Sequence, residues 1–233
     1  MNTFKFYGTQ LSQTKVMNNI LRVYNKANKE QISQNWYKEA YEFCFGLSLS
    51  HNINTTKNNK VSIAQVAGIV AALSPLTSWD RNKQLATDFL NLARTGDVTK
   101  LKCLGLSKNK AISIFLISQF WDKDKHNKEL IEKVLGGKKT SAFFENIFYY
   151  NTSKLVTIDR HALSIALGFK LSNEQFKSHS MTKAQYQFFS ECYIKAANKV
   201  NIAPLQMQSV TWTTLRIDHK IALSQSKNIL KLK

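Results

Sequence analysis

The sequence predicts an all-α fold, because apolar residues recur at helical spacing along most of the chain and only 8 glycines and 2 prolines interrupt its 233 residues. The clearest segment runs from Ile63 to Leu73, where apolar side chains follow the i, i+3, i+4, i+7 rule. The only extended candidate, Leu155 to Ile158, is too short to predict a sheet. The sequence shows no repeat with a period of 20 to 50 residues, which argues against a solenoid.

Each expected helix has a recognisable start or end. Ser62 and Gln65 form a capping box in front of the segment just described. Ser78 is the expected N-cap of a helix from Trp79 to Arg94, and Ser107 is the expected N-cap of the next helix. Further helices are expected at 129–135, at 141–150, at 159–167 with Asp159 as N-cap and Gly168 after its end, from the capping box of Thr182 and Gln185 to about Val200, and from Pro204 onward.

The charge balance points to a polyanionic partner. The chain has 33 Lys and Arg against 15 Asp and Glu, a formal net charge of +18. Such an excess favours nucleic acid ahead of an acidic membrane surface. The alternative is a compositional bias, because a chain rich in Lys, Asn and Ile is typical of AT-rich genomes.

Cysteine and histidine usage argues against a disulfide framework and a metal site. Cys44, Cys103 and Cys192 lie far apart, and the five histidines show no metal-ligand spacing. No segment approaches the roughly 18 apolar residues that cross a bilayer, and the first residues lack a secretory signal. We therefore expect a cytoplasmic, monomeric protein without metal, cofactor or membrane contact.

The segment 132–168 carries the most specific pattern. It consists of a helix, a glycine turn, a second helix, a short extended loop and a further helix opened by Asp159. This order resembles the helix-hairpin-helix DNA glycosylases, whose hairpin pattern L-P-G-V-G-x-K/S-T-A is followed by D-x-H or D-x-N at the next helix start. Aligned without gaps, Leu135, Gly137 and Ser141 take the Leu, first Gly and Lys/Ser positions. Asp159 follows Ser141 by 18 residues, as in the endonuclease III and adenine glycosylase branches.

Other segments occur in the order that this family shows. Residues 69–86 (IVAALSPLTSWDRNKQLA) are similar to its early helix, and residues 105–111 (GLSKNKA) resemble its G-L-x-x-x-K-A step. Residues 208–216 (QSVTWTTLR) echo its closing helix. The resemblance implies a two-lobed helical fold with a hairpin between two helices. The chain departs from the family at the hairpin, with Gly136 for Pro and Lys139 for the second Gly, and it lacks the cysteines of the iron–sulfur tail.

The resemblance implies that Asp159 is the catalytic carboxylate. Positive charge builds up on the sugar as the base departs, and a carboxylate beside the anomeric carbon stabilises it while water attacks. Position at a helix N-terminus favours the charged form. Considered without the hairpin spacing, Asp159 is more simply explained as an N-cap.

Ser141 stands where bifunctional members carry a catalytic lysine. A serine there implies hydrolysis by water without a Schiff base, which leaves an abasic site. Lys138 and Lys139 keep the lyase alternative open, although phosphate contact is their simpler role.

The resemblance implies two further groups of residues. One contacts DNA phosphates: Gly137, Lys138, Lys139, Thr140, His161, Lys108 and Lys110. The other forms the base pocket or the wedge that enters the stack: Leu76, Trp79, Asp80 and Asn82. Plainer roles remain open, because a lysine on a helix is usually solvated and His161 fits packing against the hairpin equally well. The remaining aromatic residues at helical spacing are expected in the core: Trp121, Phe143, Phe144, Phe148 and Trp212.

We divide the chain into three parts on this basis. Residues 1–60 are an N-terminal helical segment that packs on the second lobe and ends in a polar stretch. Residues 61–219 are the glycosylase-like domain, and residues 220–233 are a basic tail.

The leading hypothesis is a monofunctional DNA glycosylase that flips one base out of double-stranded DNA and hydrolyses its N-glycosidic bond. The alternatives are a phage-type enzyme that modifies a base on the same scaffold and a non-catalytic helix-hairpin-helix module. The sequence does not name the base. Its AT-rich bias and divergent hairpin suggest a mobile or viral setting, which makes a modified base in phage DNA, attacked as antiviral defence, a candidate target.

Overall fold

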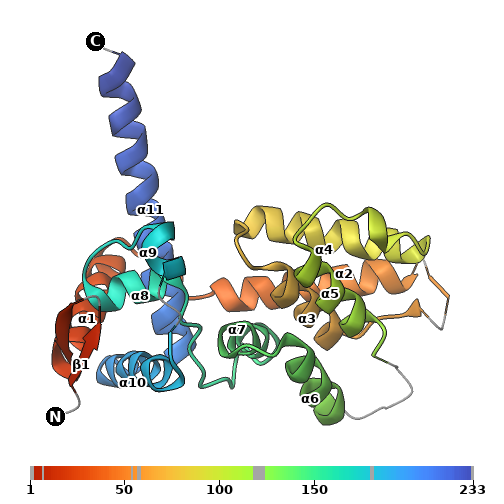
Figure 1. The fold of residues 1–233 in the computed structure, drawn as a ribbon, viewed down its shortest axis with the longest axis horizontal. Helices are drawn as coiled ribbons and strands as arrows, with labels where there is room; N and C mark the ends of the chain where they lie inside the picture. The colour runs from red at the N-terminus through yellow and green to blue at the C-terminus, as the bar shows by residue number, and fades with distance from the viewer. Residues whose placement is uncertain are drawn as a thin grey trace. The chain divides into compact units, whose positions relative to one another are not determined.

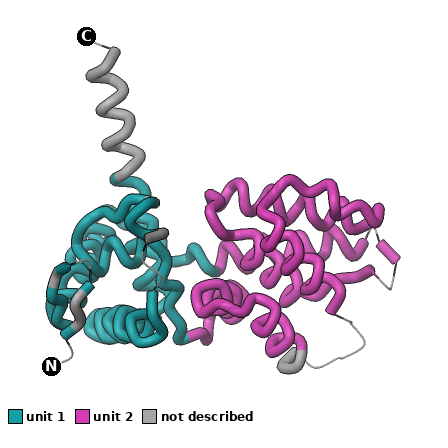
Figure 2. Tube along the Cα trace, viewed as in Figure 1, with its two compact units in different colours: residues 1–37, 154–233 teal, residues 38–153 magenta. Residues whose placement is uncertain are grey.

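The computed structural model describes residues 3–6, 8–53, 55–56, 59–117, 124–178 and 181–231. Over these residues the fold is all-α, with eleven α-helices and one short two-stranded hairpin (Figure 1). The chain divides into two compact units (Figure 2). Unit 1 combines Met1–Tyr37 with Lys154–Lys233, and unit 2 is Lys38–Ser153. Segments far apart in the sequence therefore build one unit, and the segment between them builds the other.

Unit 1 begins with a β-hairpin and continues with helices from both of its segments. Its elements are β1 (Thr3–Phe6), β2 (Thr9–Ser12), α1 (Gln13–Lys29), α8 (Arg160–Leu167), α9 (Asn173–Ser178), α10 (Lys183–Lys199) and α11 (Pro204–Lys231). The strands are antiparallel, with Phe6 opposite Thr9. The sequence analysis did not predict them, because strands of four residues are too short for an alternating pattern to show.

Helix α8 is the most enclosed element of unit 1. Every residue from Ala162 to Leu167 is buried, against core side chains that include Ile20 from α1 and Phe189 from α10. The hydroxyl of Tyr193 on α10 donates to the carbonyl of Ala162 over 2.9 Å. These contacts hold the first turn of α8 in place.

Gly168 ends α8 in the left-handed conformation, with φ of +81°. A Cβ at this position would lie 2.9 Å from Nδ2 of Asn19, and that nitrogen donates to the carbonyl of Ala166 over 3.0 Å. Both the backbone angle and the close approach of α1 therefore require glycine here.

Unit 2 consists of helices and one short 3₁₀ turn. Its elements are α2 (Trp36–Ile53, whose first two residues belong to unit 1), α3 (Ile63–Leu73), α4 (Trp79–Arg94), η2 (Val98–Lys100), α5 (Gly105–Phe115), α6 (Asp124–Leu135) and α7 (Lys138–Phe148). Helix α3 is central, and its residues from Ala64 to Leu73 are all buried.

Two residues of α3 explain its central place. A Cβ on Gly68 would lie 2.8 Å from Cγ2 of Ile131 on α6, so a glycine lets the helices approach closely. The buried amide of Gln65 donates to carbonyls at the end of α5, those of Ile114, Phe115 and Ile117, over 3.1 to 3.2 Å. Gln65 thus closes the capping box of its own helix and the open end of another.

Most of the expected helix starts are confirmed. The capping boxes of Ser62 with Gln65 and Thr182 with Gln185 are both formed, and α4 has the expected bounds, Trp79 to Arg94. Three expected starts are wrong. Helix α6 begins at Asp124, before the expected start at Glu129. Ser107 is not an N-cap, since α5 begins at Gly105 and buries Ser107 in its first turn, and α7 begins at Lys138, before Ser141. In both places the helix begins after a residue without a side-chain cap, which a search for capping residues cannot find.

Helix α11 extends from Pro204 to Lys231, and residues 232–233 and Trp121 lie outside the described residues. No helix in the described part of the chain has the length and apolar character needed to cross a membrane. The predicted division of the chain into residues 1–60, 61–219 and 220–233 remains a prediction, and the two compact units have other bounds.

Candidate functional site

The hairpin of unit 2 is a two-residue turn between α6 and α7. Gly136 has φ of +68°, and its N–H donates to the carbonyl of Glu132 over 2.9 Å, which ends α6. Gly137 is the N-cap of α7, and no side chain caps that end. The N–H of Ser141 is the first to bond back, to the carbonyl of Gly137. The amides of residues 138–140 therefore have no acceptor within the helix, which makes the turn suited to an anion.

The side chains around this turn differ in their exposure. Gly137 and Lys138 are exposed, whereas Lys139, Thr140 and Ser141 are partly buried. The hydroxyl of Thr140 donates to the carbonyl of Gly137 over 3.0 Å. The partly buried side chain of Lys139 thus lies in the first turn of α7.

The side chain of Lys110 binds the hairpin, a contact that the sequence did not predict. Its Nζ donates to the carbonyl of Leu135, the last residue of α6, over 2.5 Å. Lys108, two residues earlier and on the other side of α5, donates to the carbonyl of Thr99 over 2.8 Å. Both predicted phosphate ligands therefore already bind backbone carbonyls, and each ammonium keeps further donors for a phosphate.

A charged cluster joins α6 to α7 behind the turn. Nζ of Lys128 lies 2.8 Å from Oε2 of Glu145, 3.8 Å from Oε1 of Glu132 and 4.9 Å from the ring centre of Tyr149. Burial lowers the pKa of Lys128, but the hydrogen bond to Glu145 and the nearby carboxylates outweigh it, so its pKa is raised. Burial also raises the pKa of Glu132. The cluster fixes the angle between the two helices.

The turn between α3 and α4 presents Leu76 to solvent. Leu76 is 75% exposed and has φ of +62°, in the left-handed region. The hydroxyl of Thr77 donates to the carbonyl of Ser74 over 2.9 Å, and Ser78 caps α4. A left-handed conformation costs a residue with a Cβ about 1–2 kcal/mol. The turn therefore holds an apolar side chain outward at an energetic cost.

The other predicted wedge and pocket residues lie on the first turn of α4. Trp79 is partly buried and meets the ring of Phe43 edge to face, at 6.0 Å between centres. Asp80 is exposed and lies 3.2 Å from Nζ of Lys83. Asn82 is only 2% exposed, and its Nδ2 donates to the carbonyl of Val70 over 3.1 Å. Asn82 thus ties α4 to α3, and Leu76 and Asp80 are the solvent-exposed members of the group.

Asp159 lies at the start of α8 in unit 1. It is the N-cap, and its Oδ1 accepts the N–H of Ala162 over 2.8 Å. Its side chain is partly buried, and its Oδ2 accepts no hydrogen bond from the residues that the structure describes. The helix therefore fixes one carboxylate oxygen, and the other has no hydrogen-bond donor among the described residues.

Two tyrosines, the buried Tyr193 and the partly buried Tyr186, lie close to this carboxylate. Burial raises the pKa of Tyr186 to about 12; the hydrogen bond from the N–H of Ile158 opposes this, and the charge of Asp159 adds to it. The pKa of Tyr193 is also raised, by burial first, and the charge of Asp159 again contributes. Since the Tyr186 hydroxyl donates to the carbonyl of Val156, the segment before Asp159 is held in place.

An aromatic cluster, defined here as Trp36, His161, Trp212 and Arg216, surrounds the first turn of α8. The rings of Trp36 and Trp212 meet edge to face at 5.3 Å, and His161 meets Trp212 at 6.2 Å. The guanidinium of Arg216 lies 4.7 Å from the centre of the Trp212 ring. All four members are partly exposed, and Nε1 of Trp212 has no hydrogen-bond partner within the described structure.

Sequence reasoning missed this cluster. It assigned Trp212 to the core with Phe143, Phe144 and Phe148, of which only Phe144 is fully buried. A signal was present in the helix itself, because α11 turns polar side chains into the interior. These buried polar residues are Gln208, Ser209, Thr211 and Thr214.

A buried polar chain links this face of α11 to the segment before Asp159. The hydroxyl of Tyr37 donates to Oε1 of Gln208 over 2.7 Å and lies 3.2 Å from Oγ1 of Thr157. Thr157 is two residues before Asp159. Polar contacts therefore position the carboxylate from the side of α11 as well as from α10.

The predicted site residues fall into two sets by unit. Unit 1 contains Asp159 and His161, which share the first turn of α8 with the aromatic cluster. Unit 2 contains the hairpin residues, Lys108, Lys110 and the wedge group, and Lys110 binds the hairpin directly. Across the described residues, no group of three or more His, Cys, Asp or Glu side chains is arranged to hold a metal ion.

Comparison with known proteins gives one match. No curated protein and no solved structure matches the chain. The sequence model of a family described as "Family of unknown function (DUF7178)" matches residues 5–219. Because the match covers most of the chain, including every residue of both sets, this protein belongs to the DUF7178 family.

Proposed function

We propose that this protein is a monofunctional DNA glycosylase, which flips a base out of double-stranded DNA and hydrolyses its N-glycosidic bond with the help of Asp159. The observation that carries the proposal is the state of this carboxylate. It caps a rigidly packed helix through Oδ1, and its Oδ2 accepts no hydrogen bond from the described residues. The resemblance to helix-hairpin-helix glycosylases in residues 63–168 supplies the reaction.

The chemistry requires a carboxylate that stays charged and in place. As the base departs, positive charge develops on the deoxyribose, and Asp159 stabilises it electrostatically while a water molecule attacks the anomeric carbon. The N-terminus of α8 favours the negative form of the side chain. The hydroxyls of Tyr186 and Tyr193 hold the backbone on both sides of Asp159, so little reorganisation is needed during the reaction.

Flipping a base costs a few kcal/mol of stacking and pairing, and an inserted apolar side chain offsets part of it. Leu76 suits this role, because its turn holds it 75% exposed in a strained conformation. Strain of this kind is found where a side chain must be presented for function. The partly exposed rings of the aromatic cluster offer a stacking surface for the extruded base.

The hairpin suits the role of a phosphate clamp. The amides of residues 138–140 have no acceptor within α7, and Lys138 and Lys139 add positive charge at the same end. The net charge of +18 supports DNA as the partner. We place the protein in the cytoplasm, with no cofactor in the reaction.

The test separates the capping role of Asp159 from its chemical role. Asparagine caps a helix as well as aspartate does, so Asp159→Asn keeps the fold and the DNA affinity. We expect base release by this variant to fall about 10²- to 10⁴-fold, while Asp159→Ala loses activity and also about 1 kcal/mol of stability. Full activity of Asp159→Asn would reduce Asp159 to an N-cap and refute the proposal.

The substrate is identified by mass spectrometry of products released from normal, damaged and phage-modified DNA. A free base together with an abasic site is the expected product of a glycosylase. An altered base that remains in the DNA would instead identify a base-modifying enzyme. DNA binding without any product on all three substrates would leave a helix-hairpin-helix binding module.

A further inference from the structure

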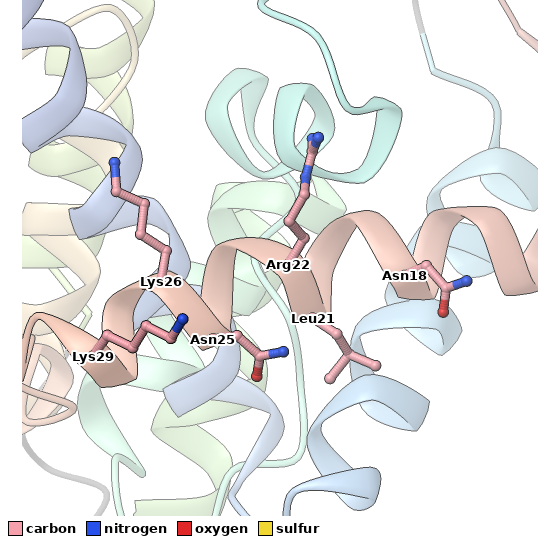
Figure 3. A pocket seen from close by; sticks show the side chains of 6 residues that line it. All are labelled: Asn18, Leu21, Arg22, Asn25, Lys26 and Lys29. Atoms are coloured by element: carbon pink, nitrogen blue, oxygen red, sulfur yellow. The ribbon is translucent and has the colours of Figure 1, made fainter.

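A groove runs along one face of α1, and none of the candidate site residues lines it. Its volume is about 620 Å³, and Figure 3 shows the six side chains that line it. These are Asn18, Leu21, Arg22, Asn25, Lys26 and Lys29. Their spacing of three and four residues places them on one face of the helix over three turns.

The charge on α1 has one sign only. The helix, Gln13–Lys29, contains one arginine, three lysines and no acidic residue. Its opposite face carries Val16, Met17 and Ile20 into the core of unit 1, so the polar face cannot turn inward. The groove therefore presents cations and amide donors to solvent.

The acidic groups near the groove neutralise only part of this charge. Nζ of Lys26 lies 2.5 Å from Oδ1 of Asp218 on α11 and 3.8 Å from Oε1 of Glu30. Arg22 and Lys29 are exposed, and within the described residues neither forms an ion pair. These two side chains are the uncompensated cations of the groove.

The arrangement of the donors fits a linear polyanion. In Figure 3 the side chains spread along the helix and do not converge on one point, as they would around a single small anion. Arg22 and Lys29 are seven residues apart, about 10 Å at the rise of an α-helix. Phosphates of one DNA strand recur about every 3.4 Å along the duplex axis, so several fall within this span. An arginine fork and asparagine amides are suitable donors to phosphate oxygens.

We propose that this face of α1, through Arg22 and Lys29 with Asn18 and Asn25 beside them, is a second surface that binds the sugar–phosphate backbone of DNA. The inference rests on the proposed function only in taking DNA as the polyanion. It adds a contact in unit 1 that is separate from the hairpin and from Asp159. This contact reads no sequence and increases affinity on any DNA.

The experiment compares two double variants with the same loss of charge. Arg22→Gln with Lys29→Gln removes the uncompensated cations of the groove. Lys60→Gln with Lys183→Gln removes two exposed lysines elsewhere, one in each unit. Binding to a fluorescently labelled DNA duplex of arbitrary sequence is measured by anisotropy over a range of salt concentrations, and thermal unfolding checks that both variants fold.

We expect the groove variant to bind about tenfold more weakly at low salt and to reduce the slope of log K against log salt by about 2, one for each lost phosphate contact. The control variant should change the slope by less than half as much. Equal effects in the two variants would show a general charge effect and overturn the proposal. Loss of binding to an RNA duplex with unchanged binding to DNA would overturn it in favour of an RNA surface.

The experiments distinguish failure of the α1 surface from failure of the proposed function. A protein that releases no base from any DNA, yet shows the expected change of salt slope in the groove variant, refutes the glycosylase and leaves the α1 surface standing. Base release together with equal salt slopes of DNA binding in the groove and control variants refutes the α1 surface and leaves the proposed glycosylase intact.

Discussion

The two units hold their candidate residues in different ways. In unit 2 most of them lie on a turn or in the first turn of a helix, as the hairpin residues do at the start of α7 and Leu76 does before α4. In unit 1, Asp159 begins a helix that is buried from Ala162 to Leu167, and an aromatic cluster lies at its first turn. A turn of the first kind suits binding of a large ligand, and a fixed carboxylate of the second kind suits chemistry.

Buried polar groups bind backbone carbonyls in both units, as Gln65 does at the end of α5 and Tyr193 does at Ala162. The units differ in the span of their bonds between buried side chains. In unit 2 Ser153 binds Asn146, seven positions away, whereas in unit 1 Tyr37 binds Gln208, 171 positions away. The long-range bond of unit 1 lies beside the segment that leads to Asp159. The predictions below test this contrast.

The largest effect on stability is expected where unit 1 is most tightly packed. Gly168→Ala places a Cβ against Asn19 in a left-handed conformation, and we expect a loss of about 2–3 kcal/mol in the free energy of unfolding. Gly96→Ala in unit 2 is the matched control, because Gly96 has φ of +76° but open space around it, and should cost about 1 kcal/mol. Denaturant titration measures both. Equal losses in the free energy of unfolding would show that the Asn19 side chain moves aside and that α1 is not closely packed on α8.

Alkaline pH should destabilise unit 1 through the raised pKa of its tyrosines. The pKa of Tyr186 is raised to about 12, so between pH 10 and 12 the unfolded chain ionises this group while the folded protein does not. The unfolded state then binds fewer protons, and stability falls as the pH rises, by about 2–3 kcal/mol over this range. When the absorbance of ionised tyrosine is followed against pH, Tyr186 should be among the tyrosines that ionise last. A Tyr186→Phe variant should lose less stability between pH 10 and 12 than the parent does.

Leu76 allows stability and activity to be changed in opposite directions. Leu76→Gly removes the left-handed strain and should stabilise the protein by about 1 kcal/mol, while base release falls because no side chain enters the stack. Leu76→Asn, which tolerates the same backbone but is polar, is the control for strain relief. Unchanged base release in both variants would exclude Leu76 as the wedge.

The smallest effect concerns covalent chemistry. Ser141 offers no amine, so borohydride should trap no adduct between the protein and an abasic duplex. A strong adduct that disappears in Lys138→Gln or Lys139→Gln would show that one of these lysines acts as a nucleophile.

Local signals predicted a large share of this fold. The capping boxes, the Asp159 N-cap and the Gly168 stop depend on side chains and angles within a few residues, and all of them are formed. The start of α5 was missed because Leu104, its N-cap, makes no capping bond. Short-range rules cannot detect a helix start that packing alone defines.

The candidate site was only partly accessible from the sequence. Asp159 stood out through its spacing from the hairpin, whereas Trp36 and Trp212 meet over 176 residues of chain, a distance that no periodicity reveals. Likewise, Asn82 looked like a pocket residue by its position, although its amide binds the carbonyl of Val70. The roles of such residues depend on which helices pack together, and one sequence does not specify that.

The discontinuous make-up of unit 1 has a consequence for biosynthesis. Lys26 and Asp218, which join α1 to α11, are separated by 192 positions, while unit 2 is one uninterrupted stretch. Because domains fold as they leave the ribosome, unit 2 can assemble early, but α1 must wait for α10 and α11 to be translated. A nascent chain therefore forms the glycine turn between α6 and α7 well before α8 and its Asp159 N-cap are packed between α1 and α10.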